Sequence, residues 1–348
     1  MGKPMSMDHR THTAGGDEKE ILTIHDVARE LGVSASTVSR AISGKGRIGE
    51  ETRQRVLQFI QDSSFHPNAA ARSLAQSRTF NLAIIMPEVR DLVDMPFFHT
   101  CMHGAEEVAQ SNDYDLLVVT TDGTNLRPLE RMVGNRKVDG MILTRTYAKD
   151  VFVEYLKQSG VPFVTVGRCY DPKVLQVDHD NSGACKELVM LLISKGMEKV
   201  AYLGGGMDQM VNIDRFDGYR QAYAAYRMET EKKWIRTDLT TKSQIAKAVD
   251  DLLKVGVDCM LCQDDYICDA VVHELADKGV SIPKDMRVAS CHYSRLLDNF
   301  PVTITSLKFD IMDIGRKAAQ VLIDQLAGKN PSTLTMLDYE ISLKESTK

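Results

Sequence analysis

The sequence predicts a small all-α headpiece of the helix-turn-helix type, followed by an α/β core of two doubly wound lobes. Three observations support this fold class. Residues 23–75 show the apolar spacing of short amphipathic helices. From Asn81 onward, short apolar runs typical of buried strands alternate with helical stretches. The alternation occurs in two successive series, which indicates two parallel sheets with helices on both faces.

The 348 residues leave room for a headpiece and two core-sized units. We expect a disordered extension at 1–20, the headpiece at 21–66, a hinge helix at 67–78 and the core at 79–348. The extension is polar, without the apolar centre of a signal peptide, and no segment approaches the roughly 18 apolar residues of a membrane span. We therefore expect a cytoplasmic protein with no membrane partner.

The first two headpiece helices are short and are joined by a glycine turn. Apolar residues from Ile24 to Leu31 recur at helical spacing, and the pattern stops at Gly32. Residues 36–42 form a second amphipathic segment whose outer face carries hydroxyl groups and one arginine. Two such helices make a helix-turn-helix, whose second helix lies in the major groove of DNA.

The polar face of the second helix has the side chains that read DNA. Arg40 offers a bidentate fork to guanine, whereas the hydroxyls of Ser34, Thr37 and Ser39 suit phosphate oxygens or mixed contacts. Charge supports this partner, because residues 21–78 carry eight Lys/Arg and five Asp/Glu while the whole chain has a net charge of −5. A basic end on an acidic protein is expected when that end approaches phosphate.

A third helix is expected from about Glu50 to Ser63 and closes the headpiece core. Its spacing predicts that Val56, Leu57 and Ile60 face inward. The same spacing leaves Arg53 and Arg55 available to the DNA backbone.

Three motifs at close spacing identify a family resemblance. They are D-V-A-x-x-x-G-V-S-x-x-T-V-S-R, then T-R-x-x-V, then H-P-N-x-x-A-R-x-L. In this combination the chain resembles the lactose-repressor (LacI/GalR) family of bacterial transcription regulators, and the resemblance continues to the C-terminus. It implies a repressor that binds a pseudo-palindromic operator as a homodimer and responds to a small effector held between two core lobes, which are similar to those of periplasmic binding proteins.

The resemblance also implies roles for individual residues. Ala35 and Ser36 occupy base-reading positions, and the segment from Asn68 to Gln76 is a hinge helix that folds only on operator DNA. Leu74 stands where the family has the leucine that opens a base step in the minor groove. The full set of candidate DNA-binding residues is Ser34, Ala35, Ser36, Thr37, Ser39, Arg40, Arg47, Asn68 and Leu74.

The first series of the core should contain four strands and three helices. The strands are expected at 82–86, 116–120, 141–143 and 163–166, and the helices at 98–110, 126–134 and 151–158. The second series has strands at 176–178, 200–203, 260–262 and 287–290, with helices at 184–195, 214–226, 243–255 and 267–278. The resemblance implies that the chain crosses back near Ser306, so that 307–330 joins the first lobe and a last strand near 337–343 joins the second.

Doubly wound sheets bind ligands outside the carboxyl ends of their strands, so the loops that follow strands are the candidate effector site. The clearest signal there is Arg215, because R-F-D-G-Y matches the family's R-x-x-G-[FY], whose arginine holds effector hydroxyls or a carboxylate. Asp264 replaces the family's usual asparagine, and His292 replaces an aspartate common in sugar-binding members. The candidate effector-binding residues are Asp91, Phe97, Arg168, Arg215, Asp264 and His292.

The charges of these residues give an expectation about the effector. Arg168, Arg215 and His292 favour a negative charge on the ligand, whereas Asp264 opposes it. We expect an acidic or phosphorylated sugar, with a neutral oligosaccharide as the close alternative. A non-sugar effector such as a nucleobase, or a core that retains only a ligand-binding or structural function, also fits. Phe97 fits both stacking on a sugar face and core packing.

Other function classes are less consistent with the sequence. The run Leu203-Gly-Gly-Gly206 follows a strand but lacks the spacing of dinucleotide or P-loop motifs, so we expect no enzyme and no cofactor. A periplasmic binding protein needs a signal peptide and no headpiece. Seven scattered cysteines suit reduced thiols. Cys259 and Cys262 lie in an apolar strand pattern that points their side chains to opposite faces, so we expect no metal site.

Overall fold

The computed structural model describes residues 22–43, 46–63, 76, 78–88 and 96–348. The chain divides into two compact units, residues 1–78 and 79–348. None of the helices in the described part of the chain is long and apolar enough to cross a membrane.

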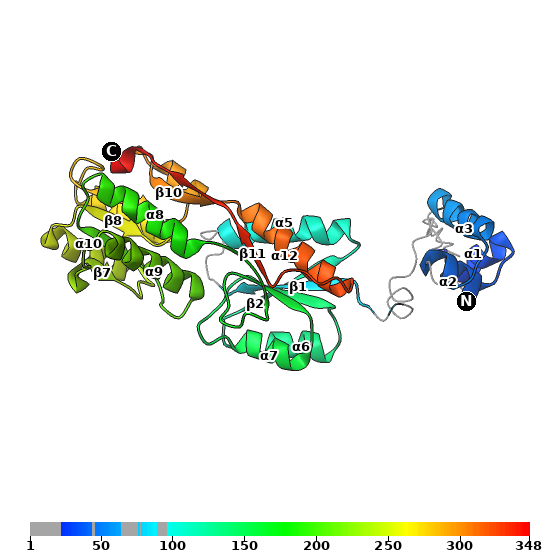
Figure 1. Ribbon diagram of the computed structural model, residues 1–348. Helices are drawn as coiled ribbons and strands as arrows, with labels where there is room; N and C mark the ends of the chain where they lie inside the picture. The colour runs from blue at the N-terminus through cyan, green and yellow to red at the C-terminus, as the bar shows by residue number, and fades with distance from the viewer. Residues whose placement is uncertain (1–21, 44–45, 64–75, 77, 89–95) are drawn as a thin grey trace, which may run out of the picture. The chain divides into compact units, whose positions relative to one another are not determined.

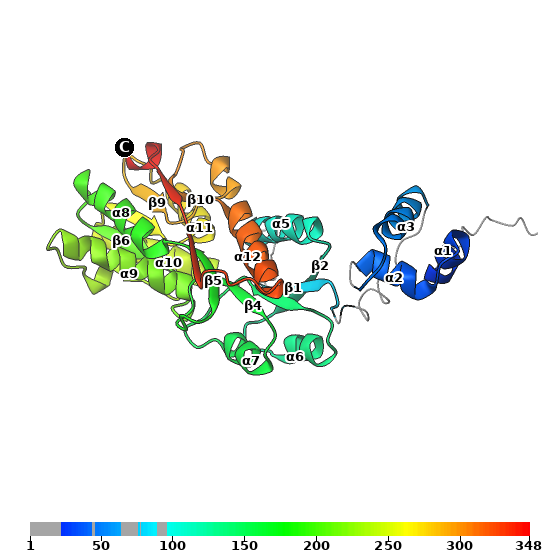
Figure 2. The same ribbon diagram turned by 45° about the vertical axis from the view of Figure 1, so that its right-hand side comes forward.

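The headpiece consists of three helices, α1 (Ile24–Leu31), α2 (Ala35–Ser43) and α3 (Glu50–Asp62), as expected. Figure 2 shows these three helices. Gly32 ends α1 in the left-handed region with φ of 65°, a conformation that glycine adopts at little cost. Val27, Val38 and Val56 are fully buried between the helices.

One detail of the third helix differs from the expectation. Val56 is buried and Ile60 packs against the core, but Leu57 is 41% exposed. Residues 56 and 57 are 100° apart around a helix, so a core this small covers only one of them.

The first lobe of the core is a parallel sheet in the order β11-β5-β4-β3-β1-β2. Its strands are β1 (Asn81–Pro87), β2 (Asp115–Thr121), β3 (Gly140–Leu143), β4 (Phe163–Val166), β5 (Leu175–His179) and β11 (Leu334–Leu337). Helices α5 (Pro96–Ser111) and α12 (Ile311–Leu326) cover one face, and α6 (Arg127–Gly134) and α7 (Val151–Ser159) cover the other (Figure 1).

The two helices α5 and α12 lie unusually close together, side by side in both views (Figures 1 and 2). A Cβ atom on Gly104 would lie 2.1 Å from the carbonyl oxygen of Met312, and one on Gly315 would lie 2.0 Å from that of Cys101. Glycine at both positions is therefore what allows the late helix α12 to pack against α5.

The second lobe is built on a sheet in the order β12-β10-β9-β8-β6-β7, parallel except for β12. The strands are β6 (Val200–Leu203), β7 (Ile235–Arg236), β8 (Cys259–Cys262), β9 (Arg287–Ser290), β10 (Thr305–Phe309) and β12 (Tyr339–Ser342). Helix α8 (Asn181–Ser194) packs against α9 (Met210–Ala225), and α10 (Lys242–Val255) packs against α11 (Asp265–Asp277). Short 3-10 turns occupy Lys232–Trp234, Arg295–Asn299 and Glu345–Thr347.

The chain passes between the lobes at three places: after β5, after β10 and after β11. An aspartate stands at each crossing, Asp180, Asp310 and Asp338. Two of them start the helix that follows, because Asp180 accepts a hydrogen bond from the amide of Gly183 and Asp310 accepts one from Asp313. Two of the three crossings are therefore anchored by helix caps.

One expectation about lobe membership is wrong, and the position of one crossing is shifted by a few residues. The strand expected at 176–178 is β5, which pairs with β4 and β11 and so belongs to the first lobe. The crossing expected near Ser306 lies after Phe309, because Ser306 pairs with Ser290 and Ser342 inside the second sheet. Residues 334–337 then form a strand of the first sheet, and the last strand of the second sheet is Tyr339–Ser342.

Candidate functional site: a DNA-reading headpiece and an inter-lobe cavity

The start of α2 is held by a cluster of hydroxyl groups. The Oγ of Ser34 accepts a hydrogen bond from the amide of Thr37 at 3.2 Å, and it lies 2.8 Å from the hydroxyls of both Ser36 and Thr37. Ser34 therefore caps the helix that the sequence identifies as the DNA reader. Ser36, Arg40 and Arg47 are exposed, so their side chains are accessible to a duplex.

Several headpiece candidates have a structural role as well. Ala35, Thr37 and Ser39 are half-buried, and Ala35 packs against the headpiece core. On α3, a guanidinium N–H of Arg55 donates to the carbonyl of Leu31 at 3.4 Å, so this side chain ties α3 to the end of α1. Asn68 and Leu74, together with the rest of the expected hinge helix up to Ala75, lie outside the described residues.

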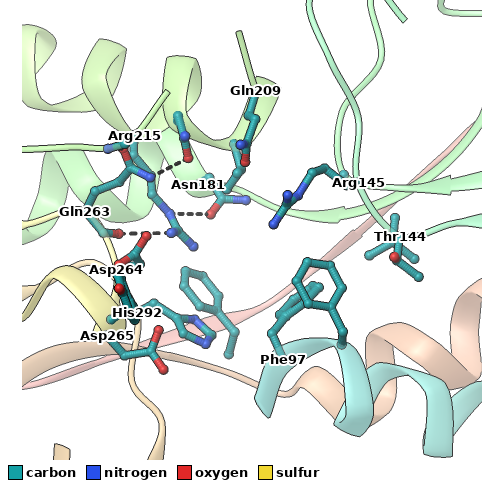
Figure 3. A pocket seen from close by; sticks show the side chains of 18 of the residues that line it. Phe97, Thr144, Arg145, Asn181, Gln209, Arg215, Gln263, Asp264, Asp265 and His292 are labelled. Carbon is teal, nitrogen blue, oxygen red and sulfur yellow. Dashed lines mark hydrogen bonds between the residues drawn. The ribbon is translucent and has the colours of Figure 1, made fainter. Parts of the chain in front are cut away.

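The core holds a cavity of about 460 Å³ between its two lobes. It lies at the carboxyl ends of strands of both sheets, where the sequence analysis expected a ligand. The residues that follow five of these strands line it: Thr144 after β3, Gly167 after β4, Gly205 after β6, Gln263 after β8 and His292 after β9. Figure 3 shows side chains of both lobes reaching into this space.

Arg215 is the most firmly held cation of the cavity. Its Nε donates to Oδ1 of Asn181 at 3.0 Å, and Nη1 donates to the carbonyl of Gln263 at 2.9 Å (Figure 3). The side chain is buried, and among the described residues its two side-chain hydrogen bonds use Nε and Nη1, which leaves Nη2 for a ligand. The guanidinium is thus oriented by the protein while keeping donor capacity for a ligand.

The glycine of the R-F-D-G-Y motif explains how Arg215 reaches Asn181. A Cβ atom on Gly218 would lie 2.1 Å from the carbonyl oxygen of Ser182, so only glycine lets α9 lie this close to the start of α8. Asn181 is held in turn by Asp178, whose Oδ1 accepts from the Asn181 amide at 3.1 Å. The motif therefore couples a helix contact to the placement of its arginine.

Aromatic rings form one wall of the cavity. The Phe97 ring meets the His292 ring edge-on with centroids 6.1 Å apart, and His292 stacks on Phe309 at 6.0 Å with an interplanar angle of 14°. Phe309 also contacts His179, at 4.8 Å. All four side chains line the cavity, so Phe97 both packs against aromatic neighbours and faces the ligand space. Such a wall suits the apolar face of a sugar ring.

Burial shifts the charges of the cavity toward neutrality. Burial and the nearby Arg215 lower the pKa of His292 to about 3, and burial, then His292 and Arg215, lower the pKa of His179 to about 4. Burial raises the pKa of Asp178 to about 7, and burial followed by Asp265 raises the pKa of Asp264 to about 6. Both histidines are therefore neutral near pH 7.

The other candidate effector-binding residues predicted from the sequence do not all lie at the cavity. Asp264 lines the cavity, and its Oδ1 also caps α11 by accepting from the amide of Ile267 at 2.8 Å. Arg168 does not line the cavity, contrary to expectation, because its guanidinium is paired with Asp214. Asp91 lies outside the described residues.

Arg145 is a cavity residue that the sequence did not single out. It enters from the first lobe, with its guanidinium carbon 5.0 Å from the centre of the Phe98 ring, and faces Arg215 across the space in Figure 3. The expectation that loops after strands face the ligand included residues 144–147, but no motif pointed to Arg145 within that loop. Asn181, Gln263 and Phe309 were missed for the same reason.

Comparison with known proteins agrees with this architecture. Residues 23–68 match the family model of "Bacterial regulatory proteins, lacI family", and residues 80–337 match that of "Periplasmic binding proteins and sugar binding domain of LacI family". The chain is 31% identical over 268 residues to the transcriptional regulator MalR of Streptococcus pneumoniae serotype 4, covering 75% of this chain and 82% of MalR. It is 28% identical to catabolite control protein A of Priestia megaterium, covering 94% and 99%.

Similarity extends to solved structures. A complex of the transcriptional regulator CelR with cellobiose superposes with a TM-score of 0.71 at 26% identity, covering 93% of this chain and 99% of that one. The headpiece match, the core match and the identity to MalR together cover nearly all of the chain from residue 23 onward. The chain therefore belongs to the LacI family of bacterial regulatory proteins, as a DNA-binding transcriptional regulator with a sugar-binding type of core.

Proposed function

We propose that this regulator is a cytoplasmic, homodimeric repressor of carbohydrate-utilisation genes, and that a sugar in the inter-lobe cavity sets its affinity for a pseudo-palindromic operator. The observation that carries the proposal is the buried Arg215, which is fixed by Asn181 and Gln263 and directed into a cavity with an aromatic wall. Hydrogen-bonding groups around ring faces are what a polyhydroxylated ring needs. The names of relatives such as MalR and the CelR–cellobiose complex support the same ligand class.

Among possible sugar ligands, the cavity favours a neutral sugar over a phosphorylated one. Two of the three cationic groups behind the earlier expectation do not act there as cations, because His292 is neutral and Arg168 is paired with Asp214. Three carboxyl groups, those of Asp178, Asp264 and Asp265, line the same space and outnumber its two arginines, Arg145 and Arg215. Carboxyl groups accept hydrogen bonds from sugar hydroxyls, and in their ionised form they repel a phosphate.

On the DNA side, we propose that α2 reads the operator through Arg40 and Ser36, with Arg47 on the backbone. The exposure of these three side chains supports this role. Half-buried Ala35 leaves room for a thymine methyl at the same surface. From the sequence alone we also propose that the alanine-rich segment 68–76 is too short to be a stable helix by itself and folds on DNA, where Leu74 would enter the minor groove.

A ligand screen on the full-length protein tests the effector. Melting temperatures are measured with cellobiose, maltose, ribose, glucose 6-phosphate and adenine. A ligand at about 100 times its dissociation constant stabilises the folded state by roughly 2.7 kcal/mol, so a true effector gives a clear shift. We expect a shift with a neutral sugar. A shift with glucose 6-phosphate alone would contradict the neutral-ligand proposal, and a shift with adenine alone would contradict the sugar proposal.

An operator titration tests the response. Operator sequences are first selected from a random DNA pool by the full-length protein, which also tests for two-fold symmetry in the selected sites. Binding to the selected site is then measured with and without the sugar found in the screen. We expect the sugar to change operator affinity by a factor of about 5 to 150, the usual range of allosteric coupling. An unchanged affinity would refute a repressor controlled through this cavity.

A further inference from the structure

The side chain of Arg168 connects the two lobes. Arg168 follows β4 in the first lobe, and Asp214 lies on α9 in the second. The Nε of Arg168 donates to both carboxylate oxygens of Asp214, at 2.9 and 3.0 Å, and Nη2 donates to Oδ1 as well. Asp214 is buried and Arg168 is 40% exposed. A guanidinium fork on a buried carboxylate is the strong form of an ion pair, since it fixes both distance and orientation.

The partner of Arg168 is next to the residue that faces the ligand. Asp214 and Arg215 are consecutive on α9, yet Asp214 contacts the first lobe while Arg215 contacts Asn181, Gln263 and the cavity. A single turn of α9 therefore carries both the inter-lobe pair and the proposed effector contact. A shift of the first lobe that separates Arg168 from Asp214 removes a first-lobe contact from the turn on which Arg215 sits.

A backbone bridge spans the same gap between the lobes. The amide of Ala148 donates to the carbonyl of Asp208 at 2.8 Å, and the amide of Met210 donates to the carbonyl of Thr146 at 3.1 Å. Residues 146–148 follow β3 in the first lobe, and residues 208–210 lead into α9 in the second. Because α9 carries Asp214 as well, the bridge and the ion pair act on one element.

We propose that Arg168 and Asp214 are positioning residues for the effector response: their ion pair fastens the two lobes in the arrangement in which both walls of the cavity are present. A ligand that touches both lobes binds this arrangement better than a more open one. The apparent affinity for such a ligand is proportional to the fraction of molecules in which the Arg168–Asp214 pair holds the two lobes together. The pair raises that population, so it strengthens effector binding without touching the effector.

Amide hydrogen exchange tests the fastening itself and needs no ligand. In the full-length protein we expect Arg168→Gln to speed exchange at the amides of Ala148 and Met210, because both donate across the gap. Arg168→Lys keeps the charge but loses the fork, and should give an intermediate rate. Exchange equal to wild type in Arg168→Gln would overturn the proposal.

The chain offers a control for the arginine in the pair formed by Arg316 and Glu107, although the acceptor Glu107 is 58% exposed and Asp214 only 11%. Nε and Nη2 of Arg316 donate to Oε2 of Glu107 at 3.0 and 2.8 Å, and Arg316 is 39% exposed, as Arg168 is 40%. Both control residues belong to the first lobe, on α12 and α5. Arg316→Gln should therefore leave exchange at Ala148 and Met210 unchanged. Equal acceleration in Arg316→Gln would show a general loss of stability and refute the specific role.

The link to the effector rests on the proposed function and is tested separately, with cellobiose as the probe. We expect Arg168→Gln to raise the dissociation constant of cellobiose by a factor of up to roughly five. Raising the salt from about 0.1 M to about 1 M shortens the screening length from about 10 Å to about 3 Å, so it should weaken cellobiose binding in wild type more than in Arg168→Gln. An unchanged dissociation constant and equal salt dependence would overturn the coupling. Failure of cellobiose to bind wild type would count against the proposed ligand, and the exchange result would still decide the fastening.

Discussion

Replacing His292 with phenylalanine should make the core less sensitive to acid. The pKa of His292 is lowered to about 3 in the folded protein, first by burial and then by Arg215, against about 6.5 in an unfolded chain. The unfolded state therefore binds the proton more tightly, and stability is lost as the pH falls below about 6.5 and down to about 3. Phenylalanine keeps a ring between Phe97 and Phe309 but has no proton to bind.

The size of the effect follows from these two pKa values. Between about pH 7.5 and about pH 5.5 the His292 term lowers the free energy of unfolding by roughly 1.4 kcal/mol. For a core of this size that corresponds to about 2–3 °C in melting temperature. Groups that do not contact His292 titrate alike in both proteins and cancel in the comparison. His179 is an exception, because His292 helps to lower its pKa; the loss of His292 in His292→Phe lets that pKa rise and adds to the difference in the same direction. The melting temperature of the core should therefore fall more steeply in wild type than in His292→Phe.

The assay is a set of thermal melts at several pH values in that range, monitored by tryptophan fluorescence. The only tryptophan of the sequence, Trp234, is buried in the second lobe, to which His292 also belongs, so its fluorescence reports unfolding of that lobe. Urea titrations at the two end points give the free energies directly. Parallel pH dependence in wild type and His292→Phe would refute the reasoning. It would mean that His292 is protonated as easily in the folded cavity as in the unfolded chain, and the case for a neutral ligand would lose one of its supports.

Three other predictions follow from the contacts. Arg215→Ala should abolish the effect of the sugar on operator binding while the operator affinity without sugar stays nearly intact. Operator titrations with and without the sugar measure both quantities, and a mutant that responds like wild type would exclude Arg215 from the site. Arg40→Ala should weaken operator binding by about 1–3 kcal/mol and relax the preference at one symmetric base pair, whereas equal loss on every sequence would indicate a phosphate contact. Gly218→Ala should lower the free energy of unfolding, measured by urea titration, by about 1–3 kcal/mol, because its Cβ would lie 2.1 Å from the Ser182 carbonyl oxygen. The control Gly134→Ala, whose Cβ would meet open space, should change that free energy little. Equal effects of the two substitutions would rule out the close approach of α9 to α8.

The cavity shows why residue type alone is a poor guide to ligand charge. Arg168, Arg215 and His292 suggested an anionic effector from their side-chain chemistry. In the folded protein Arg168 pairs with Asp214, and burial makes His292 neutral. Both changes depend on neighbours distant in sequence. The same fold brings in Arg145, which enters the cavity from a loop without a recognisable motif.

The sequence by itself determined the local structure of this protein and its family. Helices and strands follow from apolar periodicity and from capping and turn residues, which act within a few positions of one another. The headpiece motifs have the same local character, so α1, α2 and α3 and most core elements lie where the periodicity predicts them. The R-F-D-G-Y motif likewise located Arg215 at the cavity.

Only the tertiary structure decided which strand joins which sheet and where each side chain points. Residues 175–179 and 334–337 are short apolar or mixed runs whose sequence carries no information about their partners, yet both pair in the first sheet. The sequence also could not predict that Leu57 is exposed, that Arg168 pairs with Asp214 or that His292 is neutral. Each depends on the packing and electrostatic field of groups that are far away along the chain, and such long-range terms leave no periodic trace in the sequence.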